Sequence, residues 1–160
     1  LDYVNDVSRP DQGHYSVGDS WAGCRDAVAA SGTDARLEAL SHAFVPRRER
    51  LAVARGMLAG RDRPTAIIAC SGNHGLTCLH AALSLGLRVP EDLSLVVFHD
   101  APVYDDSGLE FASIAIPVAG IGCQAVAMVT EKIDRPGLSL PSVAFQTTFT
   151  SGQTCMPPPA

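Results

Sequence analysis

The sequence predicts an α/β fold in which a parallel sheet is flanked by helices. One observation is an apolar run, Thr65–Cys70, followed by helix-period apolar positions over Asn73–Leu85. Another is a second apolar run, Leu93–Phe98, soon after that helix. Parallel strands need such a crossover, which is nearly always right-handed. The third is composition, because 46% hydrophobic and 18% charged residues in a chain of 160 are typical of a globular domain.

The second half of the chain continues this alternation. We expect a strand over Phe111–Ile116 and a helix that begins at Pro117, which suits a first helical turn, and ends near Ile133. A final strand of edge type is expected over Ser142–Thr148. The helix positions expected to face the core are Val118, Ile121, Ala125 and Met128.

The first half offers helices and hardly a strand. The strands expected there are Leu1–Asn5 and a short one at Tyr15–Val17. The helices expected there are Ala22–Ala30, capped by Asp19 or Ser20, then Asp34–Phe44, and Arg47–Leu58 after Pro46. Three helices in series cannot cover a parallel sheet without strands between them. Either this half is all-helical, or pieces of sequence are absent from it.

Charge and hydropathy exclude several classes of protein. The formal net charge is -5 and the pI about 5.4, whereas a nucleic-acid-binding surface usually brings a basic excess. No segment reaches the roughly 20 apolar residues of a membrane span. The first ten residues lack the basic and apolar regions of a signal peptide.

Cofactor and metal motifs are absent from the sequence. The five cysteines are odd in number and widely spaced, without a CxxC or a Cys/His pair at zinc spacing, so we expect buried thiols and no metal site. There is no P-loop and no G-x-G-x-x-G, so no cofactor is expected. The nucleophile elbow G-x-S-x-G is also absent, because Ala69 stands where its first glycine should be. We therefore expect no catalytic residue and no enzyme.

Polar residues follow both predicted strands of the crossover unit. Ser71 and Gly72 lie between the first strand and the helix, and His99 and Asp100 end the second strand. In open α/β sheets the carboxyl ends of the strands are where ligands bind. Backbone N–H groups at the start of the helix can hold an anion or a hydroxyl oxygen. The pattern predicts a small-molecule cleft at this edge of the sheet.

Arg63–Asp100 resembles the ligand-binding domain of LacI/GalR-type transcription repressors, which share the fold of periplasmic sugar-binding proteins. The matching residues are Arg63, Pro64, Thr65, Ala66, Ile67, Leu76, Leu83, Gly86, Leu87, Val89, Pro90, Asp92, Ser94, Val96, Phe98 and Asp100. Downstream, Ser113–Val118 (SIAIPV) and Gly122–Pro136 are similar to later segments of that family. Upstream, Val17–Gly23 (VGDSWAG) resembles its strand-to-helix turn, and Arg36–Phe44 resembles one of its helices.

The resemblance implies a periplasmic-binding-protein-like fold with two subdomains. Residues 1–62 would be a partial N-terminal subdomain, because strands that the family places after Ala30 and after Phe44 have no counterpart here. Residues 63–160 would form the C-terminal subdomain. We hypothesise that segments are missing from the chain and that it lacks the N-terminal DNA-binding headpiece.

The site residues depart from the family pattern. The family's Asn-Asp pair falls on Ser71 and Gly72, and the first acid of its GFDD motif falls on His99, with Asp100 second. The carboxylate typical of sugar recognition is thus missing at His99. A neutral histidine can donate and accept hydrogen bonds, and a protonated one would favour an anionic ligand.

Each candidate binding residue also has a structural interpretation. Ser71 could simply cap the helix, His74 could be a surface residue of its first turn, and His99 could pair locally with Asp100. Two aromatic side chains could stack on a ligand: Tyr104 as a cleft wall, or a plain loop residue, and Trp21 near the cleft, or part of the core.

The predicted function is an effector-sensing domain of a LacI-type regulator, with a sugar or related polar metabolite bound between two subdomains. The resemblance further implies a cytoplasmic homodimer that contacts DNA through a headpiece outside this chain and has no membrane partner. A stand-alone sugar-binding protein of a transport system uses the same fold and is the alternative.

Overall fold

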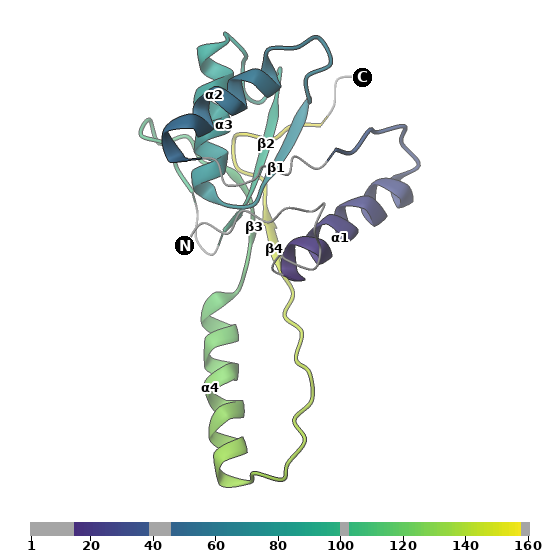
Figure 1. The fold of residues 1–160 in the computed structure, drawn as a ribbon, viewed down its shortest axis with the longest axis vertical. Helices are drawn as coiled ribbons and strands as arrows, with labels where there is room; N and C mark the ends of the chain where they lie inside the picture. The colour runs from purple at the N-terminus through teal and green to yellow at the C-terminus, as the bar shows by residue number, and fades with distance from the viewer. Residues whose placement is uncertain (1–14, 39–45, 100–102, 158–160) are drawn as a thin grey trace. The chain divides into compact units, whose positions relative to one another are not determined.

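The computed structural model describes residues 15–38, 46–99 and 103–157 and contains two compact units, residues 1–49 and 50–160 (Figure 1). The first unit contributes α1 (Tyr15–Ser31), which begins seven residues before the predicted helix. The strand predicted at Tyr15–Val17 is therefore wrong. A strand needs a neighbour to accept its backbone hydrogen bonds, whereas a helix satisfies them within itself.

The predicted helix Asp34–Phe44 is also not formed where the structure describes it. Residues 33–38 have no regular structure, and residues 39–45 lie outside the described ranges, as does the strand predicted at Leu1–Asn5. A helix this short is marginal in water unless an apolar face is buried. Arg36 and Glu38 instead form an exposed ion pair at 2.8 Å.

The helix α2 (Arg47–Leu58) has the predicted bounds. Pro46 precedes it, and the Pro46 carbonyl accepts a hydrogen bond from the backbone N–H of Glu49 at 2.8 Å. Glu49 in the first turn and Arg55 in the last turn both complement the helix dipole. The helix buries Ala54 and Leu58 in the core of the second unit.

The second unit contains a sheet with the strand order β1-β2-β3-β4 (Figure 1). Its parallel strands are β1 (Ala66–Ala69), β2 (Ser94–His99) and β3 (Ala112–Ala115). They lie inside, or within one residue of, the predicted runs, so the predicted α/β class with a parallel sheet is confirmed. An antiparallel edge strand, β4 (Thr148–Thr150), pairs with β3.

The edge strand lies later in the sequence than predicted. Only Thr148 of the predicted run Ser142–Thr148 belongs to β4, and residues 139–147 have no regular structure. The register pairs Ala115 with Thr148 and Ser113 with Thr150. Because β3 is four residues long, the segment before Thr148 has no strand beside it to pair with.

The crossover helix α3 (Gly72–Ser84) joins β1 to β2 and packs against both strands. Its C-cap is Leu85, and Gly86, with a φ of 76°, turns the chain away in a double hydrogen-bonded motif. The N–H of Leu87 donates to the Ala82 carbonyl and that of Gly86 donates to the Leu83 carbonyl, both at 3.0 Å. This arrangement is the Schellman motif, and it terminates the helix where the sequence predicts.

The core lies between α3 and one face of the sheet. Along β2 the side chains alternate, so that Leu95 and Val97 are fully buried while Val96 and Phe98 on the other face are half-buried. Gly75 lets the helix approach the sheet, because a Cβ there would overlap the Cγ1 of Val97. The buried apolar residues are Ala54, Leu58, Ala69, Leu79, Ala81, Ala82, Leu93, Leu95, Val97, Val103 and Phe111.

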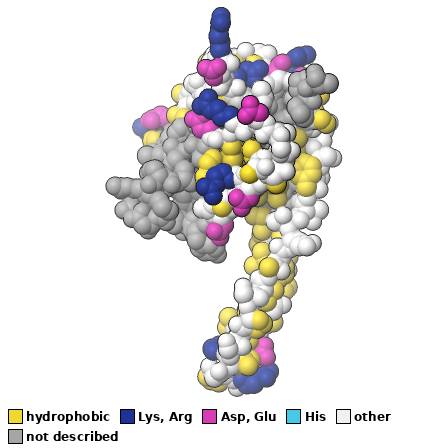
Figure 2. Space-filling model, turned by 90° about the vertical axis from the view of Figure 1, so that its right-hand side faces the viewer, with side chains coloured by type: hydrophobic (Ala, Val, Ile, Leu, Met, Phe, Trp, Pro, Cys, Tyr) yellow, Lys and Arg dark blue, Asp and Glu magenta, His cyan; other side chains and the backbone are white. Residues whose placement is uncertain are grey.

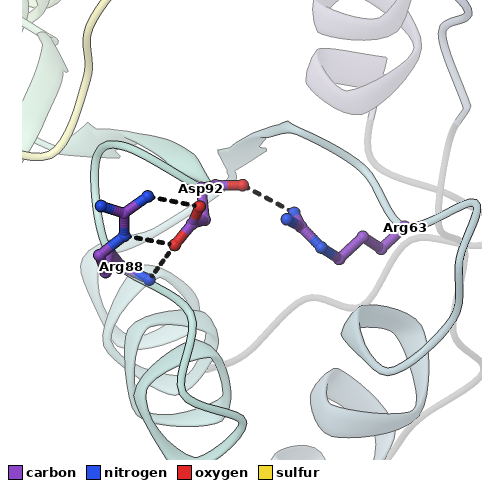
Figure 3. Close-up of polar contacts among 3 residues, drawn as sticks. All are labelled: Arg63, Arg88 and Asp92. Atoms are coloured by element: carbon purple, nitrogen blue, oxygen red, sulfur yellow. Dashed lines mark hydrogen bonds and ion pairs between the residues drawn. The ribbon is translucent and has the colours of Figure 1, made fainter.

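The turn before β2 is held by three polar residues (Figure 3). The guanidinium and backbone N–H of Arg88 donate to the Asp92 carboxylate at 2.9–3.0 Å, and Arg63 donates to the Asp92 carbonyl at 2.7 Å. The hydrogen bonds from Arg88 hold the pKa of Asp92 well below its usual range. These contacts fix the chain between α3 and β2.

The helix α4 (Val118–Asp134) begins after β3 as predicted, but none of its residues is buried. The predicted inward face is therefore wrong: Val118 and Ile121 are exposed, Ala125 is exposed, and only Met128 is half-buried. A 3.6-residue period identifies an apolar stripe but does not supply a surface to cover it. Figure 2 shows apolar side chains along the part formed by α4 and the segment after it.

A shallow, open hollow lies against α4 and is lined by Met128, Val129, Lys132 and Leu140, none of which is a predicted site residue. None of the helices within the described ranges is long and apolar enough to cross a membrane.

Candidate functional site

The carboxyl ends of the three parallel strands meet at one edge of the sheet (Figure 1). The register pairs Ala69 of β1 with Val97 of β2, so Ser71 and His99 each follow a paired position by two residues. On the other side of β2, His99 pairs with Ala115 of β3. The backbone thus brings the predicted positions 71 and 99 to the same edge, which we call the carboxyl edge.

Ser71 is the N-cap of α3 and has an extended backbone (φ -160°, ψ 161°). Its Oγ accepts a hydrogen bond from the backbone N–H of His74 at 3.4 Å and lies 2.7 Å from His74 Nδ1. The capping interpretation of Ser71 is therefore correct, and it does not preclude a ligand, because the hydroxyl also reaches a side chain of the edge.

Gly72 is the first residue of α3 and is buried, whereas His74 in the first turn is half-buried. The first backbone N–H groups of a helix point outward along its axis and carry the positive end of its dipole. With a polar hydroxyl and an imidazole beside them, these groups can hold the oxygen of an anion or of a hydroxyl.

The second strand of the crossover unit, β2, also ends at the carboxyl edge. The backbone of His99 ends β2 beside Ala115, but its side chain and all of Asp100 lie outside the described residues. Their predicted contact with a ligand stays a prediction.

Tyr104 does not lie at the carboxyl edge. It forms an isolated antiparallel bridge with Glu110, two residues before β3 begins, and so lies toward the amino ends of the strands. The Phe111 N–H donates to the Val103 carbonyl at 2.9 Å, so residues 103–111 fold back on themselves before β3. The Tyr104 side chain is 52% exposed.

Trp21 belongs to α1 in the first unit and is half-buried, and the structure gives it no place relative to the carboxyl edge. Tyr104 is thus not brought together with Ser71 and His74, and a contact of Trp21 with the ligand stays a prediction.

Sequence reasoning missed Cys70. It was expected to be a buried thiol, but Cys70 and Cys123 are exposed, while Cys24, Cys78 and Cys155 are partly buried. Burial raises the pKa of Cys78 to about 11. The Sγ of Cys70 lies 3.5 Å from His74 Nδ1 at the carboxyl edge. The sequence could have placed Cys70 at this edge, because it is the first residue after the strand, but its apolar neighbours indicated a core position.

In the described parts of the chain, no three His, Cys, Asp or Glu side chains are grouped so as to hold a metal ion. The arrangement at the carboxyl edge is suited to hydrogen bonding of a small polar molecule.

Residues 11–155 match the family of periplasmic binding protein-like domains. The chain belongs to this family. Catabolite control protein A of Staphylococcus aureus is 28% identical over 83 residues, which are 49% of this chain and 25% of that protein. The HTH-type transcriptional regulator MalR of Streptomyces coelicolor is 37% identical over 76 residues, 48% of this chain and 22% of that protein. The chain thus spans about a quarter of the length of these curated relatives.

Solved structures show the same periplasmic binding protein-like fold. A complex of the transcriptional regulator CelR with cellobiose has a TM-score of 0.75 at 21% identity, over 89% of this chain and 44% of that one. A LacI family regulator from Mycobacterium smegmatis has a TM-score of 0.72 at 24% identity, over 92% and 55%. The resemblance to LacI-type effector domains that the sequence suggests is confirmed.

Proposed function

We propose that this periplasmic binding protein-like chain is part of the effector-sensing domain of a LacI-type transcriptional regulator. The observation that carries the proposal is the carboxyl edge, where Ser71 and His74 follow the end of β1, and β1 pairs with β2, whose last residue is His99. Open α/β sheets bind ligands at such an edge. The relatives are transcriptional regulators rather than enzymes, which supports a binding role without catalysis.

The proposed effector is a small polar molecule, with a sugar or related metabolite as the first class to test. Two solved relatives were crystallised with cellobiose or sucrose. In this chain, Ser71 Oγ, the imidazole of His74 and the first N–H groups of α3 would bind hydroxyl or anionic oxygens, and His99 and Asp100 would complete the site. Trp21 is kept as a candidate for stacking on the ligand, whereas Tyr104, toward the amino ends of the strands, is not.

The proposed mechanism is a shift between two conformers. The C-terminal subdomain would be residues 63–160 together with α2, whose Ala54 and Leu58 lie in the core of the second unit, and the effector would lie between it and the N-terminal subdomain. An effector can move this equilibrium only if it binds the two conformers unequally. We propose a cytoplasmic homodimer that transmits the shift to DNA through a headpiece outside this chain.

A thermal-shift screen with sugars, nucleosides and small acids tests the site. A ligand present at about 100 times its Kd should stabilise the protein by about 2.7 kcal/mol. Ser71→Ala and His99→Ala should each abolish the shift, whereas Glu91→Gln, an exposed residue before β2 at the opposite end of that strand, should leave it intact. Trp21→Ala shows whether the indole ring contributes, and Tyr104→Ala, toward the amino ends of the strands, should leave the shift intact.

A full shift in both Ser71→Ala and His99→Ala would refute the carboxyl edge as the binding site. Sedimentation analysis separates the regulator from the transport alternative, since a dimer supports the regulator and a monomer supports a stand-alone solute-binding protein that uses the same fold.

A further inference from the structure

Cys70 and His74 form a thiol–imidazole pair at the junction between β1 and α3. Cys70 is the first residue after β1, and His74 is in the first turn of α3. The Cys70 Sγ lies 3.5 Å from His74 Nδ1, and Cys70 is exposed to solvent. A nucleophile within hydrogen-bonding reach of a base is the arrangement by which proteins activate a thiol.

The surroundings of His74 Nδ1 favour its acting as the base. Ser71 Oγ lies 2.7 Å from the same nitrogen and already accepts the His74 backbone N–H, so its own hydroxyl proton can be donated. The thiol of Cys70 can donate as well. An unprotonated Nδ1 has a single lone pair and accepts from one of these two donors at a time. With the ring proton on Nε2, His74 acts as the base of Cys70 when the Ser71 hydroxyl turns away and the thiol donates to Nδ1.

The dipole of α3 also favours the thiolate form of Cys70. The α3 helix has 13 residues and begins two residues after Cys70, so the positive end of its dipole lies beside the thiol. A thiolate next to an imidazolium and a helix N-terminus is stabilised relative to one in water.

We propose that Cys70 is a covalent modification site at which the thiol, with His74 as its base, exchanges with low-molecular-weight disulfides. His74 Nδ1 takes the thiol proton, and the Cys70 thiolate attacks one sulfur of the disulfide. A bond forms between Cys70 Sγ and that sulfur while the original S–S bond breaks. The leaving thiolate takes the proton back from the imidazolium and departs as a thiol, so the step needs no further oxidant.

The other thiols of the chain provide contrasts within the same molecule. Cys123 is exposed on α4 and serves as the reference for an accessible thiol. Cys78, one turn after His74 on α3, is partly buried and holds its proton more firmly, as its raised pKa indicates. We expect Cys70 to react first, Cys123 later and Cys78 last.

The test is a time course of the full chain with oxidised glutathione, in which peptide mass spectrometry quantifies the mixed disulfide at each cysteine. Cys70 should react at least about tenfold faster than Cys123, because a positioned base accelerates such a step. His74→Ala should reduce the Cys70 rate to about that of Cys123 and leave the Cys123 rate unchanged. Asn73→Ala, an exposed neighbour in the same turn, is the matched control and should keep the wild-type rate.

His74→Gln guards against a variant that alters the fold, because it keeps a polar side chain but has no titratable base. It must slow Cys70 as His74→Ala does. Equal rates at Cys70 and Cys123 in the wild type, or an unchanged Cys70 rate in His74→Gln, would overturn the proposal. The outcome is independent of whether the carboxyl edge binds an effector, because no effector is present in the assay.

Discussion

Replacement of Thr154 by valine removes a hydroxyl that joins two strands of the sheet while the shape of the side chain is kept. Thr154 is fully buried. Its Oγ1 accepts a hydrogen bond from the backbone N–H of Ala112 at 2.9 Å and donates to the Leu95 carbonyl at 2.7 Å. Both of these partner residues are also fully buried, so water cannot replace the lost hydroxyl.

The expected loss of stability follows from the two backbone groups that lose their hydrogen bond to Thr154 Oγ1. A buried donor or acceptor left unsatisfied costs about 1–3 kcal/mol. The Leu95 carbonyl has a second lone pair, so its share is at the low end, whereas the Ala112 N–H loses its hydrogen bond to Oγ1 outright. We therefore expect Thr154→Val to lower the free energy of unfolding by about 2–4 kcal/mol.

Urea unfolding monitored by circular dichroism measures the change as a shift of the midpoint at constant slope. Thr150→Val is the matched control, because Thr150 lies exposed in β4 and should change stability by less than about 0.5 kcal/mol. Thr154→Ser restores the hydroxyl and should recover most of the loss. If Thr154→Val unfolds at the same urea concentration as Thr150→Val, the hydroxyl does not hold the strands together and the reasoning fails.

Three further substitutions test the packing and the turn. Gly75→Ala should destabilise the protein by about 1–3 kcal/mol in the same urea assay, because its Cβ would overlap Val97 Cγ1; Gly56→Ala, in an open helical position, should be neutral or stabilising. Gly152→Ala should be at least as damaging, since Gly152 has a φ of 49° and its Cβ would meet the backbone of Phe111 and Ala112; a soluble variant with the wild-type melting temperature would contradict this. Asp92→Asn should destabilise at neutral pH, because hydrogen bonds from Arg88 lower the pKa of Asp92 in the folded state. That contribution is present above the ordinary carboxyl pKa of 3.8 and is lost as the pH falls below it, so wild type and variant should converge in acid; a constant difference across the pH range would exclude the linkage.

The elements that the sequence predicts well are those whose ends carry their own chemical signal. Pro46 before α2 and Gly86 after α3 fix the ends of these helices through backbone geometry alone. The strand β4 and the inward face of α4 were misjudged because both depend on which surface lies beside them. A period in the sequence cannot specify that surface.

In the candidate site, too, local features could be predicted from the sequence and those that depend on tertiary contacts could not. Ser71 as a helix cap and the shared edge of positions 71 and 99 follow from the strand–helix–strand pattern. That Tyr104 lies toward the amino ends of the strands depends on the pairing of Tyr104 with Glu110, which no local pattern shows. The contact between Cys70 and His74 needs the side-chain geometry of a particular turn.

The same close packing that stabilises the fold also positions the carboxyl edge. Gly75 lies in the first turn of α3, one residue after His74, and its contact with β2 fixes the distance of this turn from the sheet. The backbone N–H of Gly75 donates to the Ser71 carbonyl at 3.0 Å, so the cap is tied to the same turn. His74 is therefore presented by a rigid element rather than by a loop, which is the condition under which a hydrogen-bonding or proton-accepting group keeps its geometry. Sites held in this way require little ordering when a ligand or a disulfide arrives, so this turn is prepared in advance for the binding and the thiol exchange proposed above.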